Sequence, residues 1–162
     1  QEDQRIRGGR RPVLLVVHCS TIRWKDEDMQ SDITSLRQVY DKAFYAAQVA
    51  GSARSAAAVV PRILELFPDT QSVVDVGCGT GTWLHQFSLE GVPRILGLDG
   101  GDAPAELLHI PAGSFVRRNL AERFDLGEQF DLAITLEVAE HLAASSADAF
   151  VDNLSELSDC IV

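Results

Sequence analysis

The sequence predicts an α/β fold in which N-terminal helices precede a doubly wound parallel sheet that is incomplete. Short apolar runs alternate with amphipathic segments, one of these runs leads directly into three glycines, and an acidic residue ends the next run. Strands that alternate with helices at this spacing are typical of βαβ units. The chain has 162 residues, of which 46% are apolar, and this suits one globular domain with a real core.

Two helices are expected ahead of the glycine-rich turn. Apolar residues recur every three or four positions over 34–48, which indicates an amphipathic helix that Gly51 ends. A second helix is expected over 55–67, where Pro61 introduces a kink or a restart and Pro68 ends the helix.

Apolar and β-branched runs in the rest of the chain indicate four strands and the start of a fifth. Gly91 ends the first intervening helix, and Pro104 suits the first turn of a short second one. A sequence resembling a capping box opens the last helix at Ser145. The expected strands are 72–76, 94–98, 114–117, 130–136 and 160–162, and the expected helices are 82–90, a short one from 104, and 145–158.

The first 30 residues differ from the rest of the chain. Residues 1–25 carry a net charge of +4, and the apolar run 13–17 that follows the first basic residues is too short for a secretory signal. This run is expected to be a foreign leader or an edge strand. Because the chain begins with Gln1 and stops on an apolar run at Val162, we expect a fragment: a leader over 1–30, then the N-terminal portion of a domain over 31–162.

Composition excludes several classes of protein. No run approaches the ~18 apolar residues of a membrane span. The net charge of −10 argues against nucleic-acid binding by broad phosphate neutralisation. The three cysteines are widely spaced and form no C-x-x-C motif, so we expect buried thiols in a reducing, cytoplasmic compartment.

The glycine-rich turn is the most informative stretch. Gly77, Gly79 and Gly81 follow a strand and precede a helix, where the backbone can approach a ligand closely. Thr82 stands where a dinucleotide-binding fingerprint has its third glycine, so the spacing is G-x-G-x-G. Asp99 lies 22 residues after Gly77, where a carboxylate can accept hydrogen bonds from two ribose hydroxyls. The alternatives are an ordinary tight turn and a solvated loop acid.

These residues resemble the class I S-adenosylmethionine-dependent methyltransferases. Residues 73–81 (VVDVGCGTG) match the first motif of that family, Asp99 matches its ribose-binding acid, and 130–142 (FDLAITLEVAEHL) match the EVxEHL motif of its small-molecule branch. The resemblance implies a Rossmann-like sheet, of which this chain holds four to five of seven strands. It also implies methyl transfer from S-adenosyl-L-methionine to a small-molecule acceptor.

The resemblance further implies a set of cofactor-binding residues. Asn119 stands where the family often has Asp, and its amide still offers an acceptor oxygen. Tyr40, Tyr45 and Arg54 are weaker candidates for covering the cofactor. The implied set is Gly77, Cys78 and Gly79 along the methionine part, Asp75 behind them near the amino group, Asp99 and Gly100 at the ribose, Asn119 and Leu120 at the adenine, and Glu137 beneath the sulfonium.

His141 is the expected catalytic residue, since a histidine can accept a proton near neutral pH when the acceptor must lose one. The alternative is that His141 only packs the turn. Glu137, Glu140 and His141 share one face if the segment coils, but nothing supplies a further ligand, so no metal site is predicted.

Two other functions remain open: a non-catalytic module that binds S-adenosylmethionine or S-adenosylhomocysteine, and a nicotinamide-dependent oxidoreductase. If the sheet stops at its fifth strand, its exposed edge offers a route to a homodimer.

Overall fold

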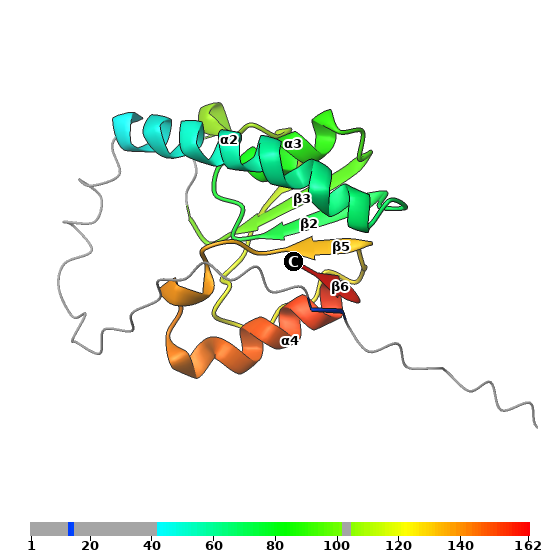
Figure 1. Cartoon of the computed structure of the whole chain (residues 1–162). Coiled ribbons are helices and arrows are strands. Elements are labelled where there is room, and N and C mark those ends of the chain that lie inside the picture. The colour runs from blue at the N-terminus through cyan, green and yellow to red at the C-terminus, as the bar shows by residue number, and fades with distance from the viewer. Residues whose placement is uncertain (1–12, 15–41, 102–104) are drawn as a thin grey trace, which may run out of the picture.

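The structure, a computed structural model, describes residues 13–14, 42–101 and 105–162 (Figure 1). Its sheet joins six strands in the order β1-β6-β5-β2-β3-β4, and every neighbouring pair is parallel. The predicted α/β class is therefore confirmed. The strands are β1 (Val13–Leu14), β2 (Ser72–Val76), β3 (Arg94–Asp99), β4 (Phe115–Arg117), β5 (Leu132–Ile134) and β6 (Cys160–Ile161).

One strand comes from a segment that the sequence left open. Val13 pairs with Cys160 and Leu14 with Ile161, so β1 extends the sheet beyond β6. All five strands expected over 72–162 are present, and β1 agrees with the edge strand that was one expectation for residues 13–17, so the outer side of β6 is paired. A two-residue strand carries almost no periodicity of its own, because its place is set by the partner strand.

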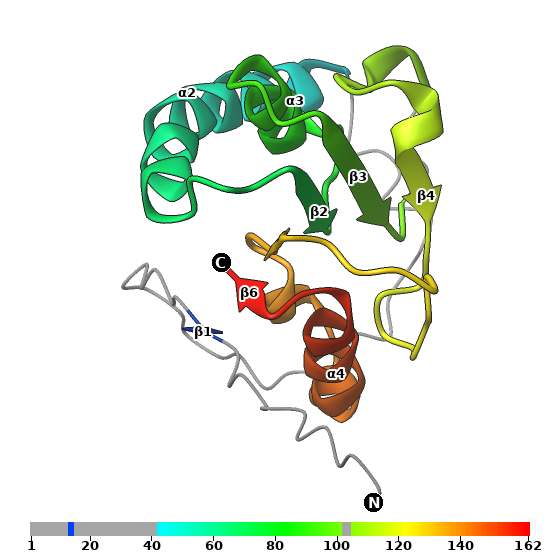
Figure 2. The same ribbon diagram turned by 90° about the vertical axis from the view of Figure 1, so that its right-hand side faces the viewer.

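Helices cover both faces of the sheet. In Figures 1 and 2, α2 (Lys42–Leu66) and α3 (Thr82–Leu89) lie over one face and α4 (Ala147–Leu157) lies over the other. Successive residues of β2 point to opposite faces, so Val73 belongs to the core beneath α2 and α3, and Val74 to the core beneath α4. This is the doubly wound arrangement.

The expected pair of N-terminal helices is one continuous helix where the structure describes it. Gly51 lies inside α2 and has no positive φ, so it does not adopt the left-handed conformation that ends a helix. Pro61 also lies within α2 and does not restart it. The alanine-rich stretch around both residues favours helix strongly enough to outweigh these two breakers. The first part of the helix expected over 34–48 falls outside the described residues.

Two helix starts also differ from expectation. The segment after β3 forms only a 3-10 turn at Ala105–Leu107, and Pro104 lies outside the described residues. The predicted capping box is wrong: the residue that caps α4 is Ser146, and its side chain makes no capping hydrogen bond. A 3-10 turn at Ala144–Ser146 leads directly into α4 and gives Ser146 helical dihedral angles, which differ from those of a side-chain N-cap.

The strand order reverses beside β2, and this reversal positions the site. The chain moves from β2 to β3 and β4 on one side, and the later strands β5 and β6 lie on the other side. In open α/β sheets, ligands bind at the carboxyl ends of the strands at such a switch point.

Among the described residues, none of the helices has the length and apolar character needed to cross a membrane.

Candidate functional site

The glycine loop at the end of β2 is bound to the end of β3. The Gly77 and Cys78 N–H groups both donate to the Leu98 carbonyl, over 2.7 and 3.1 Å. Gly77 has a φ of 94°, and a Cβ built on it would lie 2.1 Å from a methyl carbon of Val138. Only glycine therefore fits position 77, both for its backbone angle and for the close approach of the loop after β5.

Asp99, the last residue of β3, links two loops through its carboxylate. One oxygen accepts the Gly79 N–H at 2.8 Å, and the other accepts the Gly101 N–H at 2.7 Å. Each carboxylate oxygen can accept a further hydrogen bond. The structure therefore brings the predicted acid to the predicted glycine loop.

Asp75 lies in the middle of this region but beneath the surface. It sits in β2 between Gly97 of β3 and Ile134 of β5, and only 2% of it is exposed. Burial, with a smaller contribution from the negative charge of Asp99, raises the pKa of Asp75 from its ordinary 3.8 to about 8. The carboxyl group is therefore mainly protonated at neutral pH.

Cys78 presents its side chain to the interior. Its thiol is buried near Gly97, where an added Cβ would lie 2.6 Å from the sulfur. Burial is also the main reason why the pKa of Cys78 is raised. Only the backbone of Cys78 can therefore contact a ligand in the loop.

The turn after β5 brings a third set of groups to the same edge. Glu137 has a φ of 57°, and among the described residues it is the one non-glycine residue with positive φ. Such strain in a non-glycine residue is common at functional sites. The 3-10 turn Ala139–His141 then carries Glu140 and His141. A hydrogen bond with Glu140, followed by the negative charge of Glu140, raises the pKa of Glu137 above its ordinary value.

A cavity of about 500 Å³ lies between these loops. It collects most of the residues expected at the cofactor, although they come from four separate parts of the sequence. Asp75, Cys78 and Gly79 do not line it: the first two are buried, and Gly79 stands beside it through its hydrogen bond to Asp99. The lining residues are Gly77, Asp99, Gly100, Gly101, Asn119, Leu120, Glu137, Val138, His141 and Leu142.

Asn119 and Leu120 follow β4 and close the far side of the cavity. The Asn119 amide oxygen accepts the Ala121 N–H at 3.1 Å, which fixes the side chain. Leu120 is buried against the core beneath α4. Both residues therefore hold set positions on the cavity wall.

The weaker helical candidates are not brought to the cavity. Arg54 is exposed on α2 and does not line it. Tyr40 and the side chain of Tyr45 lie outside what the structure describes. Sequence reasoning also missed Thr135, whose hydroxyl donates to the Val76 carbonyl at 2.8 Å and joins the ends of β5 and β2. A threonine at the end of a buried strand gave no signal of that contact.

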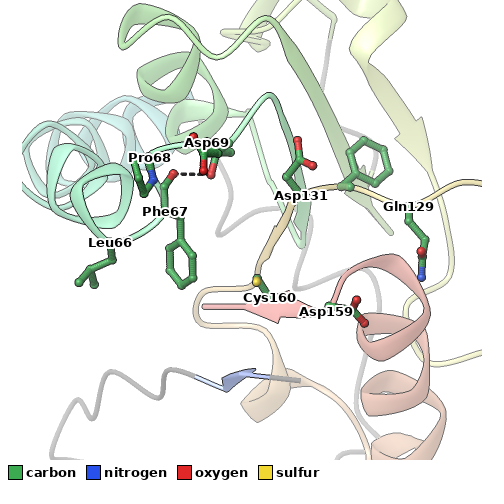
Figure 3. A pocket seen from close by; sticks show the side chains of 10 residues that line it. Leu66, Phe67, Pro68, Asp69, Gln129, Asp131, Asp159 and Cys160 are labelled. Carbon is green, nitrogen blue, oxygen red and sulfur yellow. Dashed lines mark hydrogen bonds between the residues drawn. The ribbon is translucent and has the colours of Figure 1, made fainter. Parts of the chain in front are cut away.

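A larger cavity, of about 600 Å³, opens at the amino ends of the strands, opposite the first cavity. Asp69, Asp131 and Asp159 stand around it, ahead of β2, β5 and β6 (Figure 3). Asp131 accepts hydrogen bonds from the Ser72 hydroxyl at 2.8 Å and the Gln71 N–H at 2.9 Å, and these bonds lower its pKa. Because Asp131 already holds two strand starts together, its charge has a structural role. Size alone therefore does not identify the site.

Among the described residues, no group of three or more histidine, cysteine or acidic side chains is arranged to hold a metal ion.

The profile of a methyltransferase-domain family matches residues 45–158. The chain belongs to this methyltransferase family. The predicted resemblance is confirmed, and the match spans the glycine loop, Asp99 and the turn after β5.

Individual relatives agree with the family. Over 100 residues, the chain is 34% identical to a dTDP-4-amino-2,3,4,6-tetradeoxy-D-glucose N,N-dimethyltransferase of Saccharopolyspora spinosa. The matched region covers 60% of this chain and 39% of that enzyme. A solved amino pentose methyltransferase from Micromonospora echinaspora, with S-adenosylmethionine bound, is 25% identical with a TM-score of 0.52. That match covers 83% of this chain and 55% of the other.

A magnesium protoporphyrin IX methyltransferase from Synechocystis has a TM-score of 0.54 at 22% identity, over 79% of this chain and 68% of that one. This likeness shows the fold alone. The chain spans about two fifths of the length of the Saccharopolyspora enzyme and about half of the length of the Micromonospora enzyme.

Proposed function

We propose that this methyltransferase domain binds S-adenosyl-L-methionine and takes part in methyl transfer to a small-molecule acceptor. The observation that carries the proposal is the hydrogen bond between Gly79 and Asp99, which joins the glycine loop to the acid beside the switch-point cavity. The family match and the S-adenosylmethionine-bound relative support the choice of cofactor.

The residues present fit this nucleoside. A Cβ built on Gly79 meets no atom within 4 Å, so the space above the loop is free for a ligand. The Asp99 carboxylate, already oriented by Gly79 and Gly101, retains acceptor capacity for both ribose hydroxyls. Gly100, Asn119 and Leu120 would form the wall along the adenine. The cavity volume of about 500 Å³ is in the range of small-molecule sites.

The methionine end would lie over Gly77 and the backbone of Cys78. Asp75, mainly protonated beneath the loop at neutral pH, would orient the cationic amino group and give up its proton when that charge arrives. Glu137 would stand beneath the sulfonium. The Glu137 carboxyl group, which lines the cavity, would complement the positive charge of the sulfur.

The cofactor supplies a methyl group on a positively charged sulfur, which is already activated for transfer. The residues of the chain then have to align the acceptor and exclude water. Val138 and Leu142 provide apolar wall at this end of the cavity. His141 would take the proton that the acceptor loses, because its exposed imidazole lines the same cavity.

The test is a competition for the bound cofactor. Purified chain is equilibrated with radiolabelled S-adenosylmethionine, and unlabelled S-adenosylhomocysteine or NAD is added. We expect micromolar S-adenosylhomocysteine to displace the label and NAD to leave it bound. Equal displacement by NAD, or no retained label at high micromolar concentration, would refute the proposal. Retention of label without turnover by a longer chain would favour a non-catalytic binding module.

We also infer a cytoplasmic location. The described cysteines, Cys78 and Cys160, are both free, and Cys78 is buried. Free thiols are typical of reducing compartments.

A further inference from the structure

The cavity wall that carries Asn119 and Leu120 lies in a segment without regular secondary structure. Residues 118–131, all of which the structure describes, form no helix or strand between β4 and β5. In Figure 2 this segment, in yellow, runs beside α4 before it turns back to β5. Since no helical or strand ladder of hydrogen bonds fixes this wall, other contacts have to hold it in place.

The segment is attached at its start to the end of β3. The Arg118 N–H donates to the Asp99 carbonyl at 2.9 Å, directly before the two residues of the wall. The Glu122 N–H then donates to the Asn119 carbonyl at 3.4 Å, which closes a turn around Leu120. The cavity wall is thus part of this turn, and its position depends on what holds the far side of the turn.

Asn153 of α4 holds that far side. Its side-chain N–H₂ group donates to the Glu122 carbonyl at 2.8 Å, and its side-chain oxygen accepts the Phe124 N–H at 3.2 Å. Asn153 has no exposed surface, and the other buried residues of α4 are all apolar. A buried polar side chain is unfavourable unless its hydrogen bonds are made, and both ends of this amide are bound to the one segment.

A second contact between α4 and this segment is exposed to water. Arg123 forms ion pairs with Asp152, at 2.5 Å, and with Glu156. The three side chains are 47%, 63% and 54% exposed, and ion pairs in such positions contribute little to stability. The attachment therefore depends on the buried amide of Asn153 more than on these charges.

From these contacts we infer that Asn153 is a positioning residue for the adenine of the cofactor. It does not line the cavity, and it acts through the turn that carries Asn119 and Leu120. The inference rests on the proposed function, in which these two residues form the wall along the adenine. Without the two hydrogen bonds of Asn153, the turn would occupy its binding position for only part of the time, and the apparent affinity would fall by that fraction.

The test compares two ligands that differ at the adenine. S-Adenosylhomocysteine carries this base, and S-ribosylhomocysteine has a hydroxyl group in its place. Asn153→Leu keeps a branched side chain and removes both hydrogen bonds. In calorimetric titrations, we expect it to weaken S-adenosylhomocysteine binding about tenfold, as for a wall that is in place about a tenth of the time. Its affinity for S-ribosylhomocysteine should match that of the parent chain.

Three further variants separate positioning from stability. Asn153→Asp keeps the acceptor for Phe124 and loses the donor to Glu122, so its loss of S-adenosylhomocysteine affinity should be intermediate. Leu157→Ala creates a cavity in the core at the other end of α4, so it should lower the urea midpoint and leave the ratio of the two affinities unchanged. Arg123→Gln removes the exposed ion pairs and should bind both ligands like the parent chain.

A measurement on the parent chain needs no variant. Coupling between two sites is reciprocal, so a ligand that binds the turn should also stabilise the hydrogen bonds that hold it. We expect the side-chain N–H₂ protons of Asn153 to exchange with deuterated water more slowly when S-adenosylhomocysteine is bound than when S-ribosylhomocysteine is bound. NMR of the ¹⁵N-labelled chain measures this exchange, and it decides the matter if Asn153→Leu does not fold.

An equal loss of affinity for both ligands in Asn153→Leu would give Asn153 a structural role only and would overturn the inference. Exchange of the Asn153 protons at the same rate with either ligand bound would also overturn it. In both cases the parent chain still binds S-adenosylhomocysteine, so the proposed function stands. If the parent chain binds neither ligand, the proposed function falls, and this inference falls with it.

Discussion

At the scale of single residues, Asp75 combines complete burial with a carboxyl group. Its neighbours on the adjoining strands are Gly97 and Ile134, which offer the carboxylate no compensating charge. The negative charge of Asp99 only adds to the cost of ionising Asp75. The protonated form is therefore favoured in the folded chain, and Asp75 couples stability to pH.

The sign of that coupling follows from proton binding. The pKa of Asp75 is about 8 in the folded chain, against its ordinary 3.8, so the folded chain binds more protons between these values. Its contribution to stability is therefore lost as the pH rises from about 4 to about 8, by on the order of 5 kcal/mol. We expect Asp75→Asn to remove this slope. The measurement is urea unfolding of both chains at intervals of pH, and parallel slopes in the two would contradict the assignment.

Two glycines of the loop give a matched pair. Gly77→Ala combines a φ of 94° with a Cβ 2.1 Å from Val138, so we expect a loss of about 2–4 kcal/mol of unfolding free energy. Gly79→Ala has a φ of 54° and open space, so its cost should be about 1 kcal/mol. Urea midpoints measure both losses. A smaller loss in Gly77→Ala than in Gly79→Ala would show that Val138 does not approach the loop.

The residue scale also shows where sequence reasoning stops. Three glycines in a strand–helix turn and an acid at the end of the next strand are local signals, and they predicted that the loop and Asp99 lie at one site. The hydrogen bond from the Gly79 N–H to Asp99 agrees with that prediction. The left-handed conformation of Glu137 and the contact of Val138 with Gly77 have no local signal. Both depend on how the turn after β5 is packed against a loop about 60 residues earlier in the chain.

At the scale of elements, α2 shows how far helix propensity overrides single breakers. Gly51 and Pro61 are both strong stop signals in isolation, yet α2 runs from Lys42 to Leu66. The helix expected over 55–67 is present up to Leu66, and its buried residues Ala56, Val60 and Ile63 recur at helical spacing. It failed at Gly51, where the backbone conformation depends on the residues around it.

The helical conformation of Gly51 within α2 predicts a stabilising substitution. Gly51 lacks positive φ, and a Cβ built on it meets no atom within 4 Å. We therefore expect Gly51→Ala to raise the free energy of unfolding by about 0.5–1 kcal/mol, because alanine loses less conformational freedom on folding. Thermal unfolding followed by circular dichroism measures the change. A lower melting temperature in the variant would mean that the helix is interrupted at this position.

At the scale of the whole molecule, the sheet order determines where the site lies. Strands 72–76 and 94–99 were predictable to within one residue, since their apolar runs end at glycine or an acid. The pairing of β1 with β6 was not predictable, because it joins residues nearly 150 positions apart and covers two residue pairs. The homodimer expected through the sheet edge remains a prediction, and β1 now determines which edge is exposed.

Removal of residues 1–14 tests that edge. Without β1, the outer side of β6 presents unpaired N–H and carbonyl groups, and such edges pair with other chains. We expect the shortened chain to self-associate at concentrations where the full chain is monomeric. Light scattering after size-exclusion chromatography measures the mass of each. Equal masses at all concentrations would mean that this edge does not drive association.

The two cavities lie at opposite ends of the strands, and they allow the most direct test of the central claim. This claim is that Asp99 binds the cofactor at the switch point. The measurement is calorimetric titration with S-adenosylhomocysteine of the parent chain, of Asp99→Asn, and of Asp159→Asn in the larger cavity. We predict one binding site, affinity lowered at least tenfold by Asp99→Asn, and no change with Asp159→Asn. Unchanged affinity in Asp99→Asn, or a loss confined to Asp159→Asn, would contradict the account.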